Sequence, residues 1–422
     1  MCTLPDHDVL GGSSIQDIKH GEEIYNGQGE KSQVLGTWMR TWNGKVHRIH
    51  ARGSLPITVT PEHRLLVLRG AKKRPLYGKT YRIQTKNKVR SIIRLTNDKW
   101  NDWDFEKTTV SKTPAALIRK GDYLAVPKLP ETNPQETIPF GCHGRTQRHK
   151  TAKENVELND SLAWLMGIYF AEGSVPKVLT NIQFSFNMNE QALAEKTKEL
   201  VEQCFGIPSK IIRGDHALIV AVSCSYLAKW LHEQFGGFAH DKRVPKFVIE
   251  NSRLWKEFVH GVWDGDGYQT YNGPNKNPVL GLNIATKQGA IAIFVLLTSL
   301  GIRSSIREYT QPEKAFGHGN KIYVIKVLTV RKEDSFYYQD KLWLKVRENT
   351  EQHYDGLVYD LNVPDKHTYV LNGLVSGNSE DFIALHAFKD YGYKTYVDTS
   401  VICPHILPFA VSNRGFEAVD AG

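Results

Sequence analysis

The chain has 422 residues, a formal net charge of +9 and an isoelectric point near 9.1. With 41% hydrophobic and 23% charged residues, the composition excludes a disordered chain, and the length predicts two or three folded cores. The basic balance favours an acidic partner such as nucleic acid, although a basic protein without that role fits equally well.

The cysteines and the start of the chain indicate a cytoplasmic protein. The five Cys are scattered and form no CxxC pair, which argues against a disulfide scaffold or a zinc site. The start, MCTLPDHDVLGG, lacks the basic and apolar regions of a signal peptide. No run of about 18 apolar residues predicts a membrane span. We therefore expect a monomeric protein in a reducing compartment, where a free thiol is available as a nucleophile.

Residues 2–130 have the texture of strands separated by turns. Cys2 stands near the start, and Thr60 and His63 follow in the segment TVTPEHRLLVL, three positions apart in a turn between two strands. A Cys thiol can attack the carbonyl that precedes it and exchange an amide for a thioester. His63 can protonate the leaving nitrogen while Thr60 hydrogen-bonds the strained carbonyl. A thiol without a role and a histidine satisfied within its turn are the alternatives.

Two further segments separate this region from the next. Lysines and arginines gather in residues 72–90, where a phosphate-contact surface and a solvated hairpin are equally good interpretations. Residues 131–154 are rich in proline and polar side chains and predict a linker.

Residues 155–345 contain an internal repeat. One copy begins LAWLMGIYFAEGSV at residues 162–175, and the other begins FVHGVWDGDGYQT at residues 258–270. Each copy continues with strands, a helix that ends in a Gly-Ile turn, and further strands. The repeat predicts two pseudo-symmetric halves of the αββαββ type.

Each copy places a carboxylate at the end of its first helix. Gly167 and Gly261 occupy equivalent positions where the two helices can approach closely, and Glu172 and Asp266 each precede a glycine that ends the helix. An acid opposes the negative C-terminal end of a helix, and two such acids repel each other. Bound Mg²⁺ would remove this penalty, and metal held by paired acids suits hydrolysis of a phosphodiester.

These repeats resemble the two motifs of the LAGLIDADG (DOD-type) homing endonucleases. The resemblance implies that Glu172 and Asp266 are the metal-binding catalytic acids, that Mg²⁺ is the cofactor, and that the sheets form a saddle over double-stranded DNA that is cut on both strands. Asp264 aligns with Phe170 in the other copy and is not carried over as catalytic. A decayed endonuclease that only binds DNA is the alternative.

Strand texture returns in residues 346–378, which end at Asn378 before Ser379. The side-chain amide of an Asn can attack the backbone carbonyl of the same residue, form a succinimide and break the chain. A deamidation-prone loop residue is the alternative. The segments SIQDIKHGEEI, TPEHRLLVL and VYDLNVPDKHTYVLNGLVSGN resemble inteins and their all-β, horseshoe-like Hint (Hedgehog/intein) fold, split here by the endonuclease.

The intein resemblance implies a four-step reaction that excises residues 2–378 and ligates the flanks. Cys2 forms the thioester, Ser379 takes the acyl group, Asn378 cyclises, and an acyl shift restores the peptide bond. Asp360 matches an acid that tunes Cys2 and orients water or Ser379.

One position departs from the intein pattern. Inteins usually carry a histidine immediately before the terminal Asn, and this chain has Gly377 there. His367 matches the other histidine of this region and is expected to take over that role.

Residues 379–422 resemble the catalytic end of GT-A glycosyltransferases, with Asp381 as an acid near the acceptor and His405 as a metal ligand. We interpret this segment as a host fragment, the C-terminal flank, because the nucleotide-sugar half is missing. A glycosyltransferase-family chain interrupted by an inactive insertion and a free-standing DNA-binding module with an inert β-domain are the rival hypotheses. The DNA target depends on side chains that the sequence does not place.

Overall fold

The structure is a computed structural model, and its residues fall into two compact units, Met1–Asn378 and Ser379–Gly422. The described residues are 2–73, 103–132, 135–140, 152–272, 277–310, 320–327, 334–364 and 366–378, together with 409–412 and 415–418, where a hairpin of β24 (Phe409–Ser412) and β25 (Gly415–Ala418) forms. For residues 73, 272, 277–278, 409–412 and 415–418 the backbone alone is described. The prediction of more than one folded unit is confirmed.

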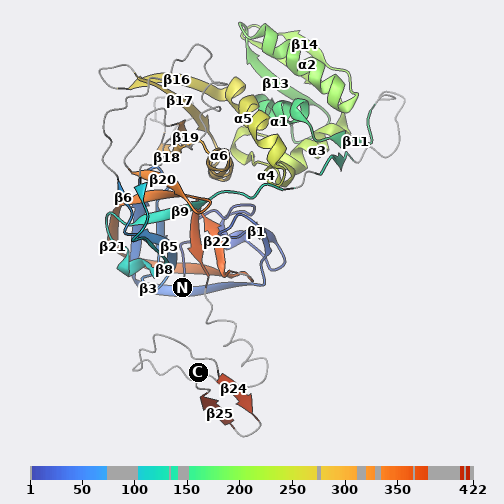
Figure 1. The fold of residues 1–422 in the computed structure, drawn as a ribbon. Coiled ribbons are helices and arrows are strands. Elements are labelled where there is room, and N and C mark those ends of the chain that lie inside the picture. The colour runs from blue at the N-terminus through green and yellow to red at the C-terminus, as the bar shows by residue number, and fades with distance from the viewer. Residues whose placement is uncertain are drawn as a thin grey trace. The chain divides into compact units, whose positions relative to one another are not determined.

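A nine-stranded sheet, in the lower part of the first unit in Figure 1, joins segments from both ends of that unit. Its main path is β22-β23-β5-β9-β21-β3-β4, with β20 paired to β21 and β8 paired to β5. The strands are β3 (Gly36–Ala51), β4 (Ile57–Val59), β5 (Arg64–Arg69), β8 (Thr109–Pro114), β9 (Tyr123–Pro127), β20 (Ser335–Tyr338), β21 (Lys341–Asn362), β22 (Thr368–Leu371) and β23 (Leu374–Gly377).

Strand β21 extends through 22 residues and changes partner along its length. Its first residues pair with β9, and after a register shift between Val346 and Glu348 it pairs with β3 as far as Asn362. Such an irregularity bends a strand and lets one strand serve two parts of a sheet. The boundary that we predicted after residue 345 therefore falls inside β21, and residues 335–345 belong to this sheet. The texture of the sequence did not show where the strand begins.

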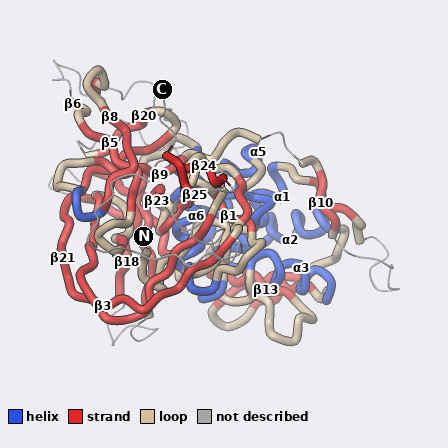
Figure 2. Tube along the Cα trace, turned by 90° about the horizontal axis from the view of Figure 1, so that it is seen from below, coloured by secondary structure: helices blue, strands red, loops and turns tan. Residues whose placement is uncertain are grey.

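The segment between β11 (Asn155–Glu157) and β20 has two halves with the same order of elements. The first is α1 (Asp160–Glu172), β12 (Gly173–Ser174), β13 (Ile182–Asn187), α2 (Gln191–Phe205), β14 (Lys210–Arg213) and β15 (Ala217–Val222). The second is α5 (Ser252–Asp266), β16 (Gly267–Asn272), β17 (Asn277–Ile284), α6 (Lys287–Ser299), β18 (Ser304–Thr310) and β19 (Lys321–Val327). The strand orders, β12-β13-β15-β14 and β16-β17-β19-β18, are equivalent. Figure 2 shows these helices gathered on one side of the first unit.

The remaining described elements connect these parts. They are η1 (Ile15–Asp17), β1 (Glu23–Tyr25), β2 (Lys31–Gln33), β6 (Lys72–Lys73), β7 (Trp103–Asp104), η3 (Ala115–Leu117), β10 (Thr137–Pro139), β11 (Asn155–Glu157), α3 (Ser225–Phe235), η4 (Ala239–Asp241) and α4 (Lys246–Ile249). Strand β10 lies in the segment predicted as a linker and pairs with β11. Among the described residues no helix is both long and apolar enough to cross a membrane.

Helices α1 and α5 pack against each other at two glycines. A Cβ added to Gly167 would lie 2.2 Å from the Phe258 carbonyl oxygen, and one added to Gly261 would lie 2.1 Å from the Trp164 carbonyl oxygen. Real side chains cannot approach a backbone this closely, so only glycine allows the contact. The predicted close approach of the two helices is confirmed.

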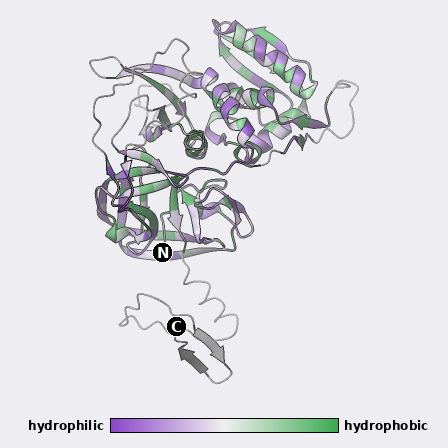
Figure 3. Cartoon of the chain, viewed as in Figure 1, coloured by the Kyte–Doolittle hydropathy of each residue, from purple (hydrophilic) through white to green (hydrophobic). Residues whose placement is uncertain are grey.

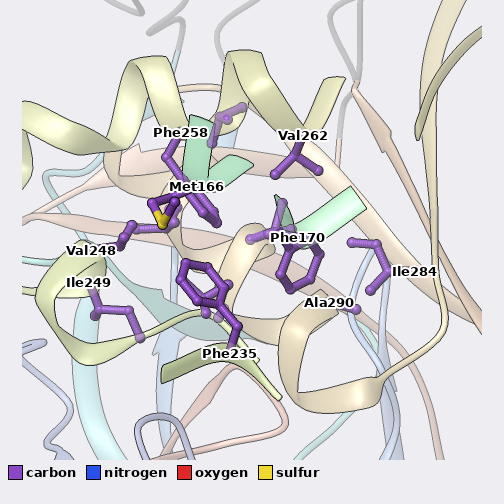
Figure 4. Packing of buried hydrophobic residues seen from close by; sticks show 14 of the residues in the cluster. Met166, Phe170, Phe235, Val248, Ile249, Phe258, Val262, Ile284 and Ala290 are labelled. Atoms are coloured by element: carbon purple, nitrogen blue, oxygen red, sulfur yellow. The ribbon is translucent and has the colours of Figure 1, made fainter. Parts of the chain in front are cut away.

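The segment between β11 and β20 is called the insertion below. One hydrophobic core continues through both of its halves. Figure 4 shows side chains of α1 and α5, among them Met166, Phe170 and Phe258, packed with Phe235 and Ile284 from other elements. The outer helix α2 is amphipathic, with purple and green residues along it in Figure 3, and it buries one face.

Helix α6 is buried from Gly289 to Thr298 and contacts both its own sheet and β9 of the nine-stranded sheet. The core of the insertion therefore reaches the nine-stranded sheet.

Candidate functional site

The backbone around Cys2 is held by the turn between β4 and β5. The hydroxyl oxygen of Thr60 accepts a hydrogen bond from the Cys2 nitrogen at 2.9 Å and donates to the Cys2 carbonyl at 3.2 Å. The Thr60 amide also donates to that carbonyl, at 2.9 Å. Thr3, the next residue, pairs with Tyr359 of β21 and Val59 of β4. Cys2 is 2% exposed, so its thiol is buried in the part of the protein built around the nine-stranded sheet, called the sheet body below.

The role expected of Thr60 differs in one respect. The sequence suggested a hydrogen bond to the carbonyl of residue 1, and that carbonyl lies outside the described residues. Thr60 instead contacts the Cys2 nitrogen, which is the nitrogen of the bond that would break. This position suits a group that orients the leaving nitrogen.

His63 is completely buried beside this turn. Its amide donates to the Thr60 carbonyl at 3.0 Å, and its Nε2 lies 2.7 Å from the hydroxyl of Ser376 on β23. Nδ1 has no hydrogen-bond partner among the described residues. Burial lowers the pKa of His63 to about 3, because a charged ring is costly away from water. His63 is therefore neutral in the resting protein.

Asp360 on β21 brings a negative charge near Cys2. It is fully buried, and its Oδ1 accepts hydrogen bonds from the Leu361 amide at 2.9 Å and the Tyr369 hydroxyl at 3.4 Å. Burial raises the pKa of the Cys2 thiol, Arg40 lowers this pKa, and Asp360 raises it. The thiol therefore rests in its protonated form and needs a base when it reacts.

Asn378 lies at the end of β23 and is 2% exposed. Its side-chain nitrogen donates to the Val363 carbonyl at 2.9 Å, and its backbone amide donates to the His367 carbonyl at 3.1 Å. Its Oδ1 has no partner among the described residues, and the same holds for His367 Nδ1. His367 thus meets Asn378 through its backbone. Ser379 lies outside the described residues.

Gly377 is packed against the main chain of β5. A Cβ at this position would lie 3.2 Å from the Arg64 carbonyl oxygen and 3.5 Å from Arg64 Cβ. The site has little room for a side chain, which gives a physical reason for glycine where inteins usually have histidine.

Glu172 and Asp266 are the last residues of α1 and α5. A Cβ added to Gly265 would lie 3.2 Å from Glu172 Cγ, so the two helix ends meet. Burial raises the pKa of both carboxyls to about 7, and the charge of Asp266 adds to the effect on Glu172. Within the described part of the chain neither carboxylate has a hydrogen-bonded partner. Carboxylates in this state fit a divalent cation, which would replace the lost solvation.

The glycines that follow these acids have a different role from the one expected. Gly173 and Gly267 have φ of −80° and −74°, so neither adopts the left-handed conformation of a usual helix stop. A Cβ at either position would instead lie within 2.6 Å of the carbonyl oxygen of the preceding turn. Asp264, which was not carried over as catalytic, accepts a hydrogen bond from Trp164 Nε1 at 2.7 Å.

Lys242 is a residue of this site that the sequence reasoning missed. It is 3% exposed, its Nζ donates to the Tyr169 carbonyl at 2.6 Å, and it lies 3.5 Å from the centre of the Tyr169 ring. Burial lowers its pKa to about 7, while the charges of Asp241, Asp266 and Glu172 raise it. A lysine in an aperiodic segment between the repeats carries no signal of burial.

Two other lysines of the repeats, Lys210 and Lys287, lie elsewhere. Lys210 is exposed on β14. Lys287 Nζ donates to the Asp6 carbonyl at 2.5 Å, in the segment that follows Cys2. The described residues contain no group of three or more His, Cys, Asp or Glu side chains that could hold a metal, so the two acids are what this site offers.

Comparison with known families decides the identity of the sheet body. Residues 13–378 match the family model of the intein splicing domain. The chain belongs to the intein splicing domain family. Cys2 and Asn378 are therefore the candidate ends of an intein, and the flanking residues are candidate exteins.

Similar curated proteins include a helicase and a DNA polymerase. The ATP-dependent DNA helicase Hel308 of Thermococcus kodakarensis is 26% identical over 92% of this chain and 37% of the helicase. A DNA polymerase of Pyrococcus horikoshii is 26% identical over 59% of this chain and 16% of the polymerase. The chain thus spans well under half the length of these relatives.

Solved structures also match part of the chain. I-DmoI in complex with DNA and Ca is 18% identical, covers 40% of this chain and 83% of I-DmoI, and has a TM-score of 0.29. The N-terminal LAGLIDADG domain of WhiA is 14% identical, covers 39% of this chain and 74% of that domain, and has a TM-score of 0.27.

Proposed function

We propose that this intein excises residues 2–378 from its host chain and ligates the flanks, and that its insertion is a metal-dependent endonuclease for double-stranded DNA. The single observation that supports the splicing part best is the contact of Thr60 with both backbone polar groups of Cys2. It fixes the nitrogen that must leave, while β23 holds the terminal Asn378 in the same sheet.

The first half of the reaction follows from this geometry. The Cys2 thiol attacks the carbonyl of residue 1, the bond to the Cys2 nitrogen breaks, and a thioester forms. Thr60 keeps the leaving nitrogen aligned, and His63 supplies its proton. Ser379 then attacks the thioester, so that the upstream flank passes to its hydroxyl oxygen and the Cys2 thiol is released.

The second half releases the intein. The Asn378 side-chain nitrogen attacks the carbonyl carbon of the same residue, and the bond to the Ser379 nitrogen breaks as a succinimide forms. The Val363 carbonyl, which accepts a hydrogen bond from that nitrogen, holds it in place and increases its electron density. The freed Ser379 amine then takes the acyl group from its own oxygen, and a peptide bond joins the flanks.

Replacing Asn378 with Ala tests this order of steps. In a chain carrying a flank on each side, Asn378→Ala removes the nucleophile of the cyclisation step and leaves Cys2 and Ser379 in place. Added thiol should still release the upstream flank, while the downstream flank stays attached, as measured by intact mass. A ligated product from this variant would contradict the scheme.

The insertion is proposed as an endonuclease because an acid ends each of two helices that meet, Glu172 on α1 and Asp266 on α5. Glu172 and Asp266 would hold Mg²⁺, which supplies Lewis-acid stabilisation of the phosphate and an activated water. Lys242 is a buried lysine whose pKa is raised by the charges of both acids, and it would offset charge that develops on the phosphate. This part rests on the residues and on the resemblance to LAGLIDADG endonucleases.

Matched acid variants test the endonuclease. Glu172→Gln should reduce cleavage of target DNA by roughly a hundredfold or more while gel-shift affinity and splicing stay unchanged. Asp264→Asn is the control, because Asp264 lies in the last turn of α5 beside Asp266 and accepts a hydrogen bond from Trp164. Equal cleavage by wild type and Glu172→Gln, or none by wild type on any target with DNA still bound, would favour a decayed endonuclease that only binds DNA.

We also propose a cytoplasmic protein, because Cys2 must stay reduced to react, and the monomeric state stays a prediction. The host fragment at residues 379–422 remains a prediction: Asp381 and His405 lie outside the described residues, and the glycosyltransferase resemblance has no support beyond the sequence.

A further inference from the structure

Four completely buried polar side chains form a row through the sheet body. They come from three structural elements: His63 from the β4–β5 turn, Asp360 from β21, and Tyr369 and Ser376 from the β22–β23 hairpin. Each has no exposed surface. Buried polar groups require partners, and a complete network holds its members in one arrangement.

The members of the row follow one another by contact. His63 Nε2 lies 2.7 Å from Ser376 Oγ. Ser376 stands directly opposite Tyr369 in the register of β22 and β23, so the two side chains are neighbours on one face of the hairpin. The Tyr369 hydroxyl donates to Asp360 Oδ1 at 3.4 Å.

The carboxylate sets the direction of all these hydrogen bonds. An ionised Asp360 only accepts, so the Tyr369 hydroxyl proton points toward it. The Tyr369 oxygen then accepts from Ser376, and the Ser376 oxygen accepts from Nε2 of His63. A neutral imidazole carries a single N–H. The proton of His63 is therefore on Nε2, and Nδ1 presents a lone pair with no partner among the described residues.

We propose that Ser376 and Tyr369 are positioning residues that hold His63 as a base for Cys2. This inference rests on the proposed splicing function and assigns a role to two hydroxyls in its first step. His63 Nδ1 takes the proton from the Cys2 thiol as the sulfur bonds to the carbonyl carbon of residue 1. The same proton then passes from Nδ1 to the Cys2 nitrogen as its bond to that carbon breaks. No other reactant is consumed, and His63 ends neutral.

The row also explains how the buried His63 ring can carry the proton that it takes from the Cys2 thiol. Burial opposes a charged His63, and an isolated cation in the sheet would be costly. The row ends in the Asp360 carboxylate, whose negative charge is transmitted through two polarised hydroxyls. The arrangement resembles in its logic the acid that orients a catalytic histidine in a hydrolase. It also ties the entry site at Cys2 to the hairpin that ends at Asn378.

The test measures thioester formation at the upstream junction in a flanked chain that carries Asn378→Ala. Hydroxylamine traps the thioester, at concentrations where the rate no longer depends on the trap. We expect Ser376→Ala and Tyr369→Phe each to slow this step about tenfold or more at pH 7. In both variants the rate should rise about tenfold per pH unit toward the thiol pKa, since solvent must now remove the proton. The parent should show a flatter profile.

Three comparisons separate positioning from simple loss of structure. Ser376→Thr, which keeps the hydroxyl, should restore both rate and profile. The double variant should be no slower than either single variant, because both act through one row. Thr368→Val removes a buried hydroxyl of the same hairpin that bonds the Gly27 amide instead. It should lower thermal stability and leave the pH profile unchanged.

The outcomes distinguish two kinds of failure. Variants with the parent's rate and pH profile, or multiplicative losses in the double variant, would overturn the relay and leave splicing intact. A folded parent that forms no trappable thioester would overturn the proposed splicing function itself.

Discussion

At the residue scale, Glu172 and Asp266 place two carboxyl groups at the adjoining ends of α1 and α5. Burial raises the pKa of each to about 7, against about 4 for exposed carboxyls. The folded protein therefore binds more protons than the unfolded chain between these values, and stability falls as the pH rises from about 4 to about 7. A divalent cation would offset this loss where both groups are ionised.

Mg²⁺ should therefore stabilise the protein at pH 8 and have little effect at pH 5. A site that binds the folded state alone adds about 2.7 kcal/mol at a cation concentration of a hundred times its Kd, a rise in Tm of roughly a few degrees for a chain of this size. Thermal unfolding with and without Mg²⁺ at the two pH values measures this.

The double variant Glu172→Gln, Asp266→Asn is the control. It should lose the response to Mg²⁺ and be more stable than wild type at pH 8 without metal. The same rise in Tm at both pH values, or in the double variant, would contradict the account.

The reactive residues show how far sequence can reach at this scale. Cys2, His63 and Asn378 could be proposed because their chemistry needs particular residue types in order along the chain. Ser376 and Lys242 could not, because a serine in a strand and a lysine in a loop acquire their roles only from burial and from neighbours distant in sequence. The hydrogen-bond partner of Thr60 could not be predicted from the sequence either. Both the carbonyl of residue 1 and the nitrogen of Cys2 were chemically acceptable partners.

At the element scale, the packing of α1 on α5 depends on glycine. Gly261→Ala would put a methyl group 2.1 Å from the Trp164 carbonyl oxygen, so the helices must separate. Overpacking of this kind costs about 1–3 kcal/mol. Denaturant unfolding should show a loss of that size, and DNA cleavage should fall because the acids at the helix ends move apart.

Gly214→Ala is the matched control for this prediction. A Cβ there would lie 3.4 Å from the Ala217 carbonyl oxygen, an ordinary contact in a turn of the first half. Its stability and cleavage should stay near wild type. Equal effects of the two substitutions would contradict the role given to the α1–α5 contact.

The internal repeat made the contact of α1 with α5 predictable from the sequence. The nine-stranded sheet has no such repeat, and less of it could be predicted. Because Gly167 and Gly261 recur at one point of each copy, their meeting could be inferred before any coordinates. The 22-residue strand β21 has no repeat and no turn signal at its bend, so its start and its change of partner were missed. The reason for a glycine after each helix was predicted wrongly. Gly173 has an ordinary negative φ, and glycine is needed because a Cβ there would clash with the carbonyl oxygen of the preceding turn.

At the scale of the whole first unit, the insertion and the splicing body share a core through α6. The ring of Phe294 lies 3.3 Å from where a Cβ of Gly373 would be, in the turn between β22 and β23. Ser299 Oγ accepts a hydrogen bond from the Leu129 amide at 2.9 Å. The helix that completes the second repeat therefore also supports the hairpin that ends at Asn378.

Residues 2–378 should accordingly unfold in one cooperative transition. Phe294→Ala should lower the free energy of unfolding by about 3–5 kcal/mol and reduce hydrogen-exchange protection in β22–β23 as well as in β17–β19. Calorimetry and hydrogen exchange measure both. Two separate transitions, with only the insertion weakened by the substitution, would contradict a shared core. Nothing in the sequence indicated this contact, since an apolar helix does not show which neighbours cover it.

The central claim is that Cys2 and Asn378 are the two ends of a self-excising segment. The most direct test places folded reporter domains on both sides of the chain and measures intact masses after expression. The account predicts two products: residues 2–378 with a C-terminal succinimide or its hydrolysis product, and the two flanks joined by a peptide bond immediately before Ser379. Cys2→Ala should abolish ligation. A folded wild-type chain that remains whole, or flanks that are released without being joined, would contradict it.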